Sequence, residues 1–560
     1  MRIFVGLVGI FFSCTCIQAQ NADILLGHDL YHYVDRLDIQ GLSGDFFPTT
    51  LKPYGRQVVA DFFATVDTQR LSPVENQWHK RMRILVDDAY TSSTSQKGIW
   101  NTFYTNGRDL YHVDKEPNKF RLYVNPSFHL ALGNEQETFL STERQGHTLL
   151  NNIRGLSIRG VLWDKIGFYT EVTDNVIRVP QEIFQNFEEN DQLYDQTFVK
   201  RFGNTENGLD FFNARAYLTF RPIEAMRIKV GKDRAFWGLG RQSLFLNDHA
   251  ADYAFVNIQT KIWKLVYVNH FTQLLDFVPN KGDTEGTWPR KYGVFHQLSY
   301  FPTNTISLSL FESIIYNPYL ANGKRGFEIQ YLNPLIFFRA IEQSLGSPDN
   351  ATIGFSAKVN AWNRFQLYGQ FLIDDLNIGQ RDNGDDYWGN KLGYQVGAKY
   401  INAFSIPTLD LQVEYNRVRP YTYQHFNIAA NYSQFDQSLG HAAGANLYDL
   451  YVGLRYHPLP PLNIELAYTT LTQGLDMDGI NYGGDINRSY SVDRAGDFGQ
   501  IVGQGDPLNM DQIYGRLTYQ LWNTDIYAEI EGRYRTENER ESASILGGVR
   551  MGLPQRIVKF

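Results

Sequence analysis

The sequence predicts an all-β protein: an antiparallel transmembrane β-barrel of about eighteen strands, preceded by a small helical hairpin. Three observations support this. From about residue 120 onward, apolar and polar residues alternate with period two. Tight turns alternate with long polar connections, as in outer-membrane barrels, whose hairpins are short at one end and long at the other. Aromatic residues make up 15% of the chain, with 35 Tyr and 38 Phe, which suits girdles at both membrane interfaces.

The first segment of the chain is typical of an exported protein. Residues 1–19 contain Arg2, the uncharged run "IFVGLVGIFFSCTC" and a small-residue end in "IQAQ", which predicts a cleaved signal peptide. The run is too short for a membrane-spanning helix. Cys14 and Cys16 are the only cysteines and lie within it. The mature chain is therefore expected to lack disulfides, zinc–thiolate sites and a cysteine nucleophile.

Composition also argues against several classes of partner and cofactor. The chain has 60 acidic and 52 basic residues, and an acidic chain without a basic run is a poor nucleic-acid binder. Its 12 histidines are scattered without a paired spacing, so we expect no zinc and no other cofactor. The stretch "DMDGINYGGD", with Asp476, Asp478 and Asp485, has carboxylates of calcium-loop type. It lacks the full EF-hand spacing and the late glutamate, which favours a solvated acidic loop.

A helical period occupies residues 54–90. The stretch "RQVVADFFATV" places its apolar residues on one face. In "SPVENQW", Ser72 is an N-cap, Pro73 fits the first helical position and Glu75 completes a capping box. These signals predict a helical hairpin at residues 54–90, within an N-terminal periplasmic region at residues 20–118. We expect the hairpin to be dispensable for barrel insertion.

Residues 119–560 form the predicted barrel. Stretches such as "TLDLQVEYN" and "LNIELAYTT" alternate cleanly, but strands of a soluble sandwich do so too, so the connection lengths carry the argument. Tight turns occur at "LWDKIG", "TKIWKL", "AWNRF" and "LWNTDI", whereas long acidic loops occupy 176–209, 375–390, 420–446 and 473–511. The predicted strands are 121–132, 150–161, 165–176, 210–221, 225–234, 252–261, 265–274, 290–301, 305–316, 350–360, 364–374, 391–401, 408–418, 447–457, 462–472, 513–522, 525–535 and 544 onward. Their even number requires 317–349 to be one outer-side excursion.

One stretch inside that excursion, "EIQYLNPLIFFRAIEQ", begins like a strand and continues as a helix. Asn333 is a plausible N-cap, and the residues that follow place aromatic side chains on one face with Arg339 and Glu342 on the other. We predict that residues 327–346 fold inward as a plug, with the two charges bonded to wall groups such as Asp374. A surface cap over the barrel mouth is the alternative.

A second unusual stretch is "AFWGLGRQSL". Its glycines allow a tight backbone path beneath Trp237, with Arg241 pointing at a carboxylate or an anionic sugar. The alternative is a loop pinned against the barrel wall. Ser243 and His249 suggest a hydrolase, but no nucleophile-elbow motif accompanies them, so catalysis is the weakest hypothesis.

Three segments carry a family resemblance. "GKDRAFWGLGRQSLFLND", "YLNPLIFFRAIEQSLGSPDN" and "NRFQLYGQFLIDDL" resemble hallmark segments of the Wzi-type capsule-assembly barrels, closest to the gliding-motility RemB branch of Bacteroidota. The resemblance covers most of the chain from about residue 50, and that family has an N-terminal helical piece before an eighteen-stranded barrel. It implies a non-enzymatic outer-membrane protein that helps hold surface polysaccharide or supports gliding motility. The candidate plug or glycan-binding residues are Trp237, Arg241, Tyr331, Asn333, Arg339, Glu342, Gln370 and Asp374.

Two main function hypotheses follow. The first is an outer-membrane protein, exported through a cleaved signal peptide, that binds or organises surface polysaccharide or supports gliding motility. Its partners would be lipid and either polysaccharide or gliding and secretion proteins, and Tyr- and Trp-bearing loops would stack on sugar rings. The second is a transport pore with an open lumen. An inward-folded helical loop argues against the pore, because it would obstruct the lumen.

Overall fold

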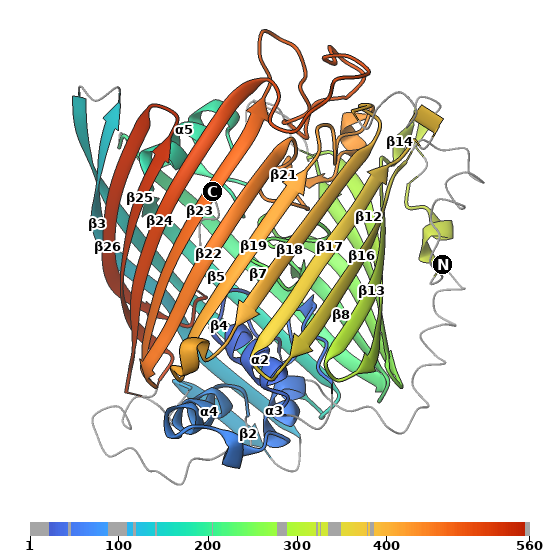
Figure 1. Cartoon of the computed structure of the whole chain (residues 1–560). Helices are drawn as coiled ribbons and strands as arrows, with labels where there is room; N and C mark the ends of the chain where they lie inside the picture. Colours follow the sequence, from blue (N-terminus) through green and yellow to red (C-terminus); the bar gives the residue numbers. More distant parts are fainter. Residues whose placement is uncertain are drawn as a thin grey trace.

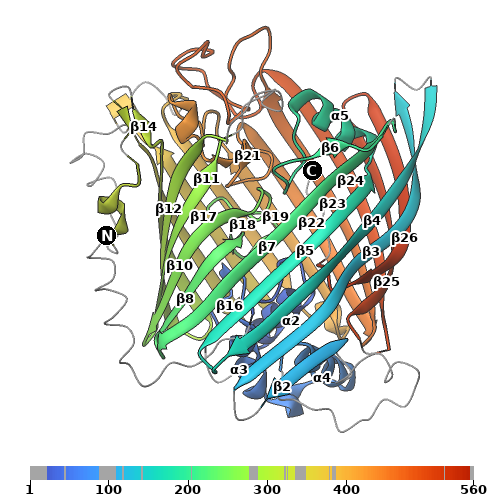
Figure 2. The same cartoon turned by 180° about the vertical axis from the view of Figure 1, so that it is seen from behind.

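The computed structural model describes residues 22–42, 46–87, 109–115, 119–139, 143–203, 205–276, 288–320, 323–324, 326–333, 349–377, 379–380, 386–522 and 524–554. Eighteen long antiparallel strands close into a barrel (Figures 1 and 2). The ring closes where β26 pairs with β3, in a register that places Met551 opposite Phe128. The predicted fold class and strand number are confirmed. The predicted signal peptide, residues 1–19, lies outside the described residues.

The barrel strands follow one another around the wall in chain order. They are β3 (Phe120–Phe139), β4 (Glu143–Leu162), β5 (Ile166–Arg178), β7 (Gly208–Ile223), β8 (Met226–Asp233), β10 (Tyr253–Ile262), β11 (Leu265–Leu275), β12 (Arg290–Thr303), β13 (Ile306–Tyr316), β16 (Asn350–Ala361), β17 (Phe365–Asp375), β18 (Lys391–Tyr400), β19 (Leu409–Val418), β22 (Leu447–Leu459), β23 (Leu462–Leu475), β24 (Asp506–Leu521), β25 (Ile526–Glu537) and β26 (Arg540–Met551). The short strands β2 (Tyr111–Lys115) and β6 (Lys200–Arg201) add to β3 and β7.

Connection lengths differ between the two ends of the barrel, as the sequence predicts. β13 pairs directly with β16, so residues 317–349 form a single excursion from one end. At the opposite end, tight hairpin turns carry tryptophans with left-handed backbone, namely Trp163, Trp263, Trp362 and Trp522. These side chains are exposed, and Trp is enriched at membrane interfaces. We refer below to the short-turn end and the long-loop end.

Three N-terminal helices lie at the short-turn end, whereas α5 (Gln181–Asn190) lies at the long-loop end (Figures 1 and 2). The predicted hairpin is present as α3 (Arg56–Ala64) and α4 (Pro73–Val86). The capping box is formed: the Glu75 N–H donates to Ser72 Oγ, and the Ser72 N–H donates to the Glu75 carboxylate at 3.0 Å. No helix within the described residues is long and apolar enough to cross a membrane.

Helix α2 (Leu30–Gln40) was not predicted, and it docks into the short-turn mouth of the barrel. Asp35 pairs with Lys399 of β18 at 2.6 Å, and Asp38 pairs with Lys358 of β16 at 2.7 Å. Burial alone would raise the pKa of Asp35, but the Lys399 ammonium outweighs it and the pKa is lowered. Arg36 joins α2 both to Asp410 of the wall and to Glu75 of α4. Ion pairs thus hold α2 in this mouth of the lumen, against β16, β18 and β19.

The predicted inward fold of residues 327–346 is not what their described part shows. The 3₁₀ helix η5 (Ile329–Leu332) lies against the outer face of the wall. Tyr331 is fully buried against Val294 and Ile314, which alternate with the lumen-facing Phe295 and Phe311. In Figures 1 and 2 this segment is seen outside the barrel. Residues 334–348, with Arg339 and Glu342, lie outside the described residues.

Candidate functional site: an occluded lumen and an aromatic loop surface

The connection between β8 and β10, residues 234–252, folds into the lumen. We call it the lumen loop. Its Trp237 and Phe245 rings are fully buried and pack edge-to-face and stacked, respectively, on Phe311 of the wall. Phe236 and Trp237, as β9, pair with Leu51 and Lys52, as β1, of the N-terminal region. The lumen loop and the N-terminal region therefore meet inside the barrel.

Glu414 of β19 fixes the glycine-rich turn of the lumen loop. This fully buried carboxylate accepts the Arg241 N–H at 2.7 Å and the Gln242 N–H at 2.9 Å. Hydrogen bonds to a charged acceptor are stronger than neutral ones. A Cβ at Gly240 would collide with the Glu414 carboxylate, so the close approach requires glycine. The Arg241 side chain, which the sequence predicts to point at a carboxylate or an anionic sugar, donates from Nη1 to Thr469 Oγ1 at 3.3 Å.

Gln370 of β17 holds the lumen loop from a second direction. Its Oε1 accepts the Leu244 N–H at 2.8 Å, and its Nε2 donates to the Trp237 carbonyl at 3.0 Å. Because both halves of the amide are used and the residue is buried, Gln370 is a structural clamp on the loop. Trp237 is buried in the same contact, so its ring does not offer a surface for stacking a sugar.

Asp374 anchors the connection between β19 and β22 over the lumen loop. It pairs with Lys391 at 3.2 Å and accepts the Tyr423 N–H at 2.6 Å. Tyr423 belongs to the connection between β19 and β22, and its hydroxyl donates to the Leu244 carbonyl at 3.0 Å. The half of the lumen bounded by β10 to β19 is consequently a packed core, which includes Trp237, Leu244, Phe245, Leu246, Phe295, Leu372, Tyr423 and Tyr432.

The candidate residues that the structure describes therefore divide into two groups. Trp237, Arg241 and Gln370 meet at the lumen loop, and Asp374 lies behind it. Tyr331 lies on the outer face and donates its hydroxyl proton to Asp349, while Asn333 is exposed at the end of η5. Sequence reasoning missed Glu414 and Tyr423, because "TLDLQVEYN" and the long loop after it show alternation and polarity without revealing their partners.

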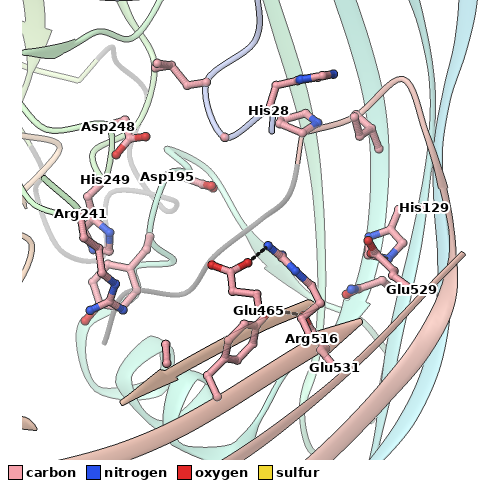
Figure 3. A pocket seen from close by; sticks show the side chains of 18 of the residues that line it. His28, His129, Asp195, Arg241, Asp248, His249, Glu465, Arg516, Glu529 and Glu531 are labelled. Carbon is pink, nitrogen blue, oxygen red and sulfur yellow. Dashed lines mark hydrogen bonds and ion pairs between the residues drawn. The ribbon is translucent and has the colours of Figure 1, made fainter. Parts of the chain in front are cut away.

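The other half of the lumen, bounded by β3 to β7 and β22 to β26, retains a cavity of about 460 Å³. Arg241 points into it from the lumen loop, facing Glu465 of β23 and Arg516 of β24 (Figure 3). His28, preceding α2, lines its short-turn side, and burial lowers the pKa of that imidazole. Ile183 of α5 lines its long-loop side. The volume is in the range of small-molecule sites.

Several charged groups on the cavity wall are paired with one another. Glu465 accepts from Arg455 at 3.0 Å and from Arg516 at 2.5 Å. On the opposite wall, Glu171 pairs with Arg215 at 3.2 Å. Pairing of this kind is expected of charges held in a barrel lumen.

A run of aromatic rings lies at the long-loop end. We call it the aromatic loop surface; it consists of Tyr387, Trp388, Phe426, Tyr490 and Phe498. Neighbouring ring centroids are 5.0–6.4 Å apart along the run, which joins three separate loops. Phe426 and Phe498 are 44% and 45% exposed. The Trp388 N–H donates to the Asp497 carbonyl at 2.9 Å, so two of the loops are tied together.

Ser243 and His249, the residues behind the hydrolase hypothesis, have separate partners. The Ser243 hydroxyl donates to the Trp237 carbonyl at 2.5 Å, and the His249 ring packs on Tyr194 with centroids 4.4 Å apart. In the acidic loop, Asp476 pairs with Arg488 at 2.6 Å. Among the described residues, no group of three or more His, Cys, Asp or Glu is arranged to hold a metal ion.

Comparisons with known proteins identify the fold. No family model and no curated protein matches this chain. Among solved structures, the chain is similar to Wzi of Escherichia coli, described as an outer-membrane protein involved in group 1 capsule assembly and a carbohydrate-binding β-barrel. The identity is 11%, the TM-score is 0.55, and the match covers 96% of this chain and all of Wzi. Pseudomonas aeruginosa OprD (11% identity, TM-score 0.38, covering 76% of this chain and 96% of OprD) and OccK8 (8%, 0.42, 77% and 98%) are more distant. The chain thus has the fold of an outer-membrane barrel.

Proposed function

We propose that this protein is a non-enzymatic outer-membrane barrel, exported through a cleaved signal peptide, that binds surface polysaccharide through its long-loop end. The aromatic loop surface is the observation that carries the proposal. Five rings from three loops form a continuous run, with two of them half-exposed at the end where outer-membrane barrels place their external loops. Flat rings backed by fixed loops suit the apolar faces of pyranose sugars.

Occlusion of the lumen supports the same proposal. The lumen loop fills one half of the barrel, and α2 is held in the short-turn mouth by ion pairs with two strands. A protein closed in this way acts at its surface more readily than through its pore. The sequence resemblance to the RemB branch of Bacteroidota adds a cellular context, in which the bound polysaccharide serves gliding motility or capsule assembly and gliding or secretion proteins are partners.

Polysaccharide sedimentation tests the proposal. Purified protein in lipid vesicles is mixed with surface polysaccharide from the source cells, and the bound fraction is measured. The double variant Phe426→Ala with Phe498→Ala is expected to bind about tenfold more weakly, since each stacked ring contributes about 0.5–1.5 kcal/mol. Phe404→Ala, which removes an exposed ring at the short-turn end, is the control. Equal binding by the double variant and the parent would contradict the proposal.

A transport pore is the second candidate, and the cavity in the β3–β7 half of the lumen favours it. A pore requires a continuous path past α2 and α5. Single-channel recording in planar bilayers separates the two functions: a large, steady parent conductance would support transport, and a quiet parent would support the surface function.

A further inference from the structure

Helix α5 lies at the long-loop end of the barrel, over the lumen cavity (Figure 2). Its apolar side belongs to one buried cluster with the wall: Ile183, Phe184 and Phe187 of the helix join Leu209 and Phe211 of β7. Burial of apolar side chains is insensitive to pH, so these contacts attach α5 to the β5–β7 side of the mouth under all conditions in which the barrel is folded.

Neutral amides fix the two ends of the same segment. The Asn207 side chain donates to the Val179 carbonyl at 2.9 Å, just before α5 begins. Beyond the end of α5, the Gln437 side chain donates to the Gln196 carbonyl at 2.7 Å. Amide side chains do not titrate, so these ties are also independent of pH.

Charged groups hold α5 on its other side. Glu182 pairs with Arg533 of β25, and the Gln181 N–H donates to the Glu135 carboxylate of β3 at 2.7 Å. In the ring of strands, β25 is separated from β5 by β26, β3 and β4. The helix thus bridges part of the mouth, with apolar contacts at one side and charges at the other. We call Glu135, Glu182 and Arg533 the latch.

The latch contains two carboxylates and one guanidinium. Glu135 is fully buried; one of its oxygens accepts from Gln181, and the other has no hydrogen-bond partner in the described part of the chain. That second oxygen lies 3.8 Å from Arg533, which is already engaged by Glu182. Two carboxylates that share one site resist being ionised together.

The other polar neighbours of Glu135 do not neutralise it. His147 of β4 and Ser544 of β26 lie opposite Glu135 in the sheet register. The His147 ring is 3.9 Å from the carboxylate of Glu137, two residues further along β3, and Arg540 pairs with Glu137 at 2.9 Å. Within the described residues, the cation paired with Glu135 is therefore the shared Arg533.

Burial, and then the Glu182 charge, raise the pKa of Glu135 to about 7. Glu135 lies in the last third of the 20-residue strand β3, beyond the roughly 9–11 residues that span a bilayer. With α5 in place this carboxyl keeps its proton up to about pH 7, whereas an exposed Glu ionises above about pH 4.5. The closed position is therefore most favoured in acid, and it loses that advantage as the pH rises from 4.5 to 7.

We propose that α5 is a lid over the lumen cavity, latched to β25 in acid and released from it at neutral and higher pH. The proton on Glu135 is the switch. Neutral Glu135 accepts the Gln181 N–H without opposing Glu182, whereas ionised Glu135 competes with Glu182 for Arg533. Release opens the cavity from the long-loop side, while α2 stays in the opposite mouth. No latch residue belongs to the aromatic loop surface, so the lid is independent of polysaccharide binding.

A distance measurement between α5 and the wall tests the proposal. The only cysteines, Cys14 and Cys16, lie in the predicted signal peptide, so introduced cysteines are the labelling sites of the processed chain. Glu189→Cys at the exposed end of α5 and Ala543→Cys on the exposed face of β26 each carry a nitroxide spin label. Double electron–electron resonance then measures the label separation in the full chain, in lipid vesicles between pH 4 and 9. Altered migration on SDS gels before and after heating confirms that each variant is folded.

We expect one separation in acid and a second, longer one at higher pH. The ratio of the longer to the shorter population should rise by up to tenfold per pH unit between about pH 4.5 and 7, and level off above pH 7. Glu135→Gln, which keeps the acceptor for Gln181 but cannot ionise, should keep the shorter separation at every pH.

Two matched variants separate this switch from its neighbours. Glu137→Gln removes the next carboxylate on the same face of β3, and His147→Gln removes an imidazole, a group that commonly titrates between pH 5 and 8. Both are expected to retain the pH dependence of the parent. A separation that does not change with pH in the parent, or a pH dependence that persists in Glu135→Gln, would overturn the proposal.

Discussion

Removing the Glu414 carboxylate is expected to release the lumen loop. In Glu414→Ala the buried N–H groups of Arg241 and Gln242 lose their acceptor. An unsatisfied buried donor costs about 1–3 kcal/mol, so leaving both N–H groups without an acceptor is expected to destabilise the closed loop by roughly 2–6 kcal/mol. Water entering the vacated space would return part of this free energy, which places the expected loss in the lower half of that range.

Two measurements follow this perturbation. The midpoint of heat-induced migration change on SDS gels reports barrel stability, and planar-bilayer recording reports closure of the lumen. The parent is expected to be quiet, and Glu414→Ala is expected to show transient openings and a lower midpoint. Glu531→Ala serves as the control, because Glu531 accepts from Tyr514 on the cavity wall. If Glu414→Ala matched the parent in both measurements, the carboxylate would not be what holds the loop.

Three further predictions concern the two ends of the barrel. Arg36→Ala should weaken the attachment of the N-terminal helices to the barrel by about 3–5 kcal/mol, because Glu75 and Asp410 lose a shared buried partner. Faster proteolysis of residues 22–86 in an inserted barrel checks this. Burial and then Arg83 lower the pKa of His79 to about 4, so its neutral form stabilises the helices above pH 6.5. About 3 kcal/mol of this stability is lost as the pH falls from 6.5 to 4. His79→Gln should abolish that pH dependence, measured by the same proteolysis in acid titrations. Trp362 is 84% exposed and has a left-handed backbone. Because Asn tolerates that backbone better, Trp362→Asn should stabilise the hairpin by about 1 kcal/mol in detergent. Because Trp favours the membrane interface, the same variant should insert more slowly into lipid vesicles, and the same effect in both media would contradict an interfacial role.

The strands were predictable because each carries its own evidence. In β19, alternation alone assigns Leu411 and Val413 to one face and Asp410, Gln412 and Glu414 to the other, and the structure pairs them in that register. The capping box of α4 is equally local, since Ser72 and Glu75 are three residues apart. Patterns whose partners lie within a few residues are visible in a single sequence.

Helix α2 shows where this reasoning stops. Its Asp35, Arg36 and Asp38 are buried, whereas an amphipathic pattern assigns charged residues to solvent. Their partners on the barrel wall are 364, 374 and 320 residues away along the chain. The same distance problem hides the lumen loop, because the N–H groups of Arg241 and Gln242 meet Glu414 across 173 and 172 residues. Only the folded barrel brings these pairs together.

The sequence predicts the stretch at 327–346 on the wrong side of the wall in its described part, and the reason is physical. Its aromatic face favours burial, and the prediction assigns that burial to the lumen, as in a soluble protein. A barrel inverts that relation, because its lumen is polar and its outer face is apolar. Tyr331 accordingly packs on the outward-facing Val294 and Ile314. The lumen loop is apolar inside the barrel because lumen-facing wall residues such as Phe311 and a second inward loop with Tyr423 and Tyr432 supply it with apolar partners. For a segment of a barrel protein, an apolar face therefore favours the outer wall unless apolar residues of the lumen can cover it.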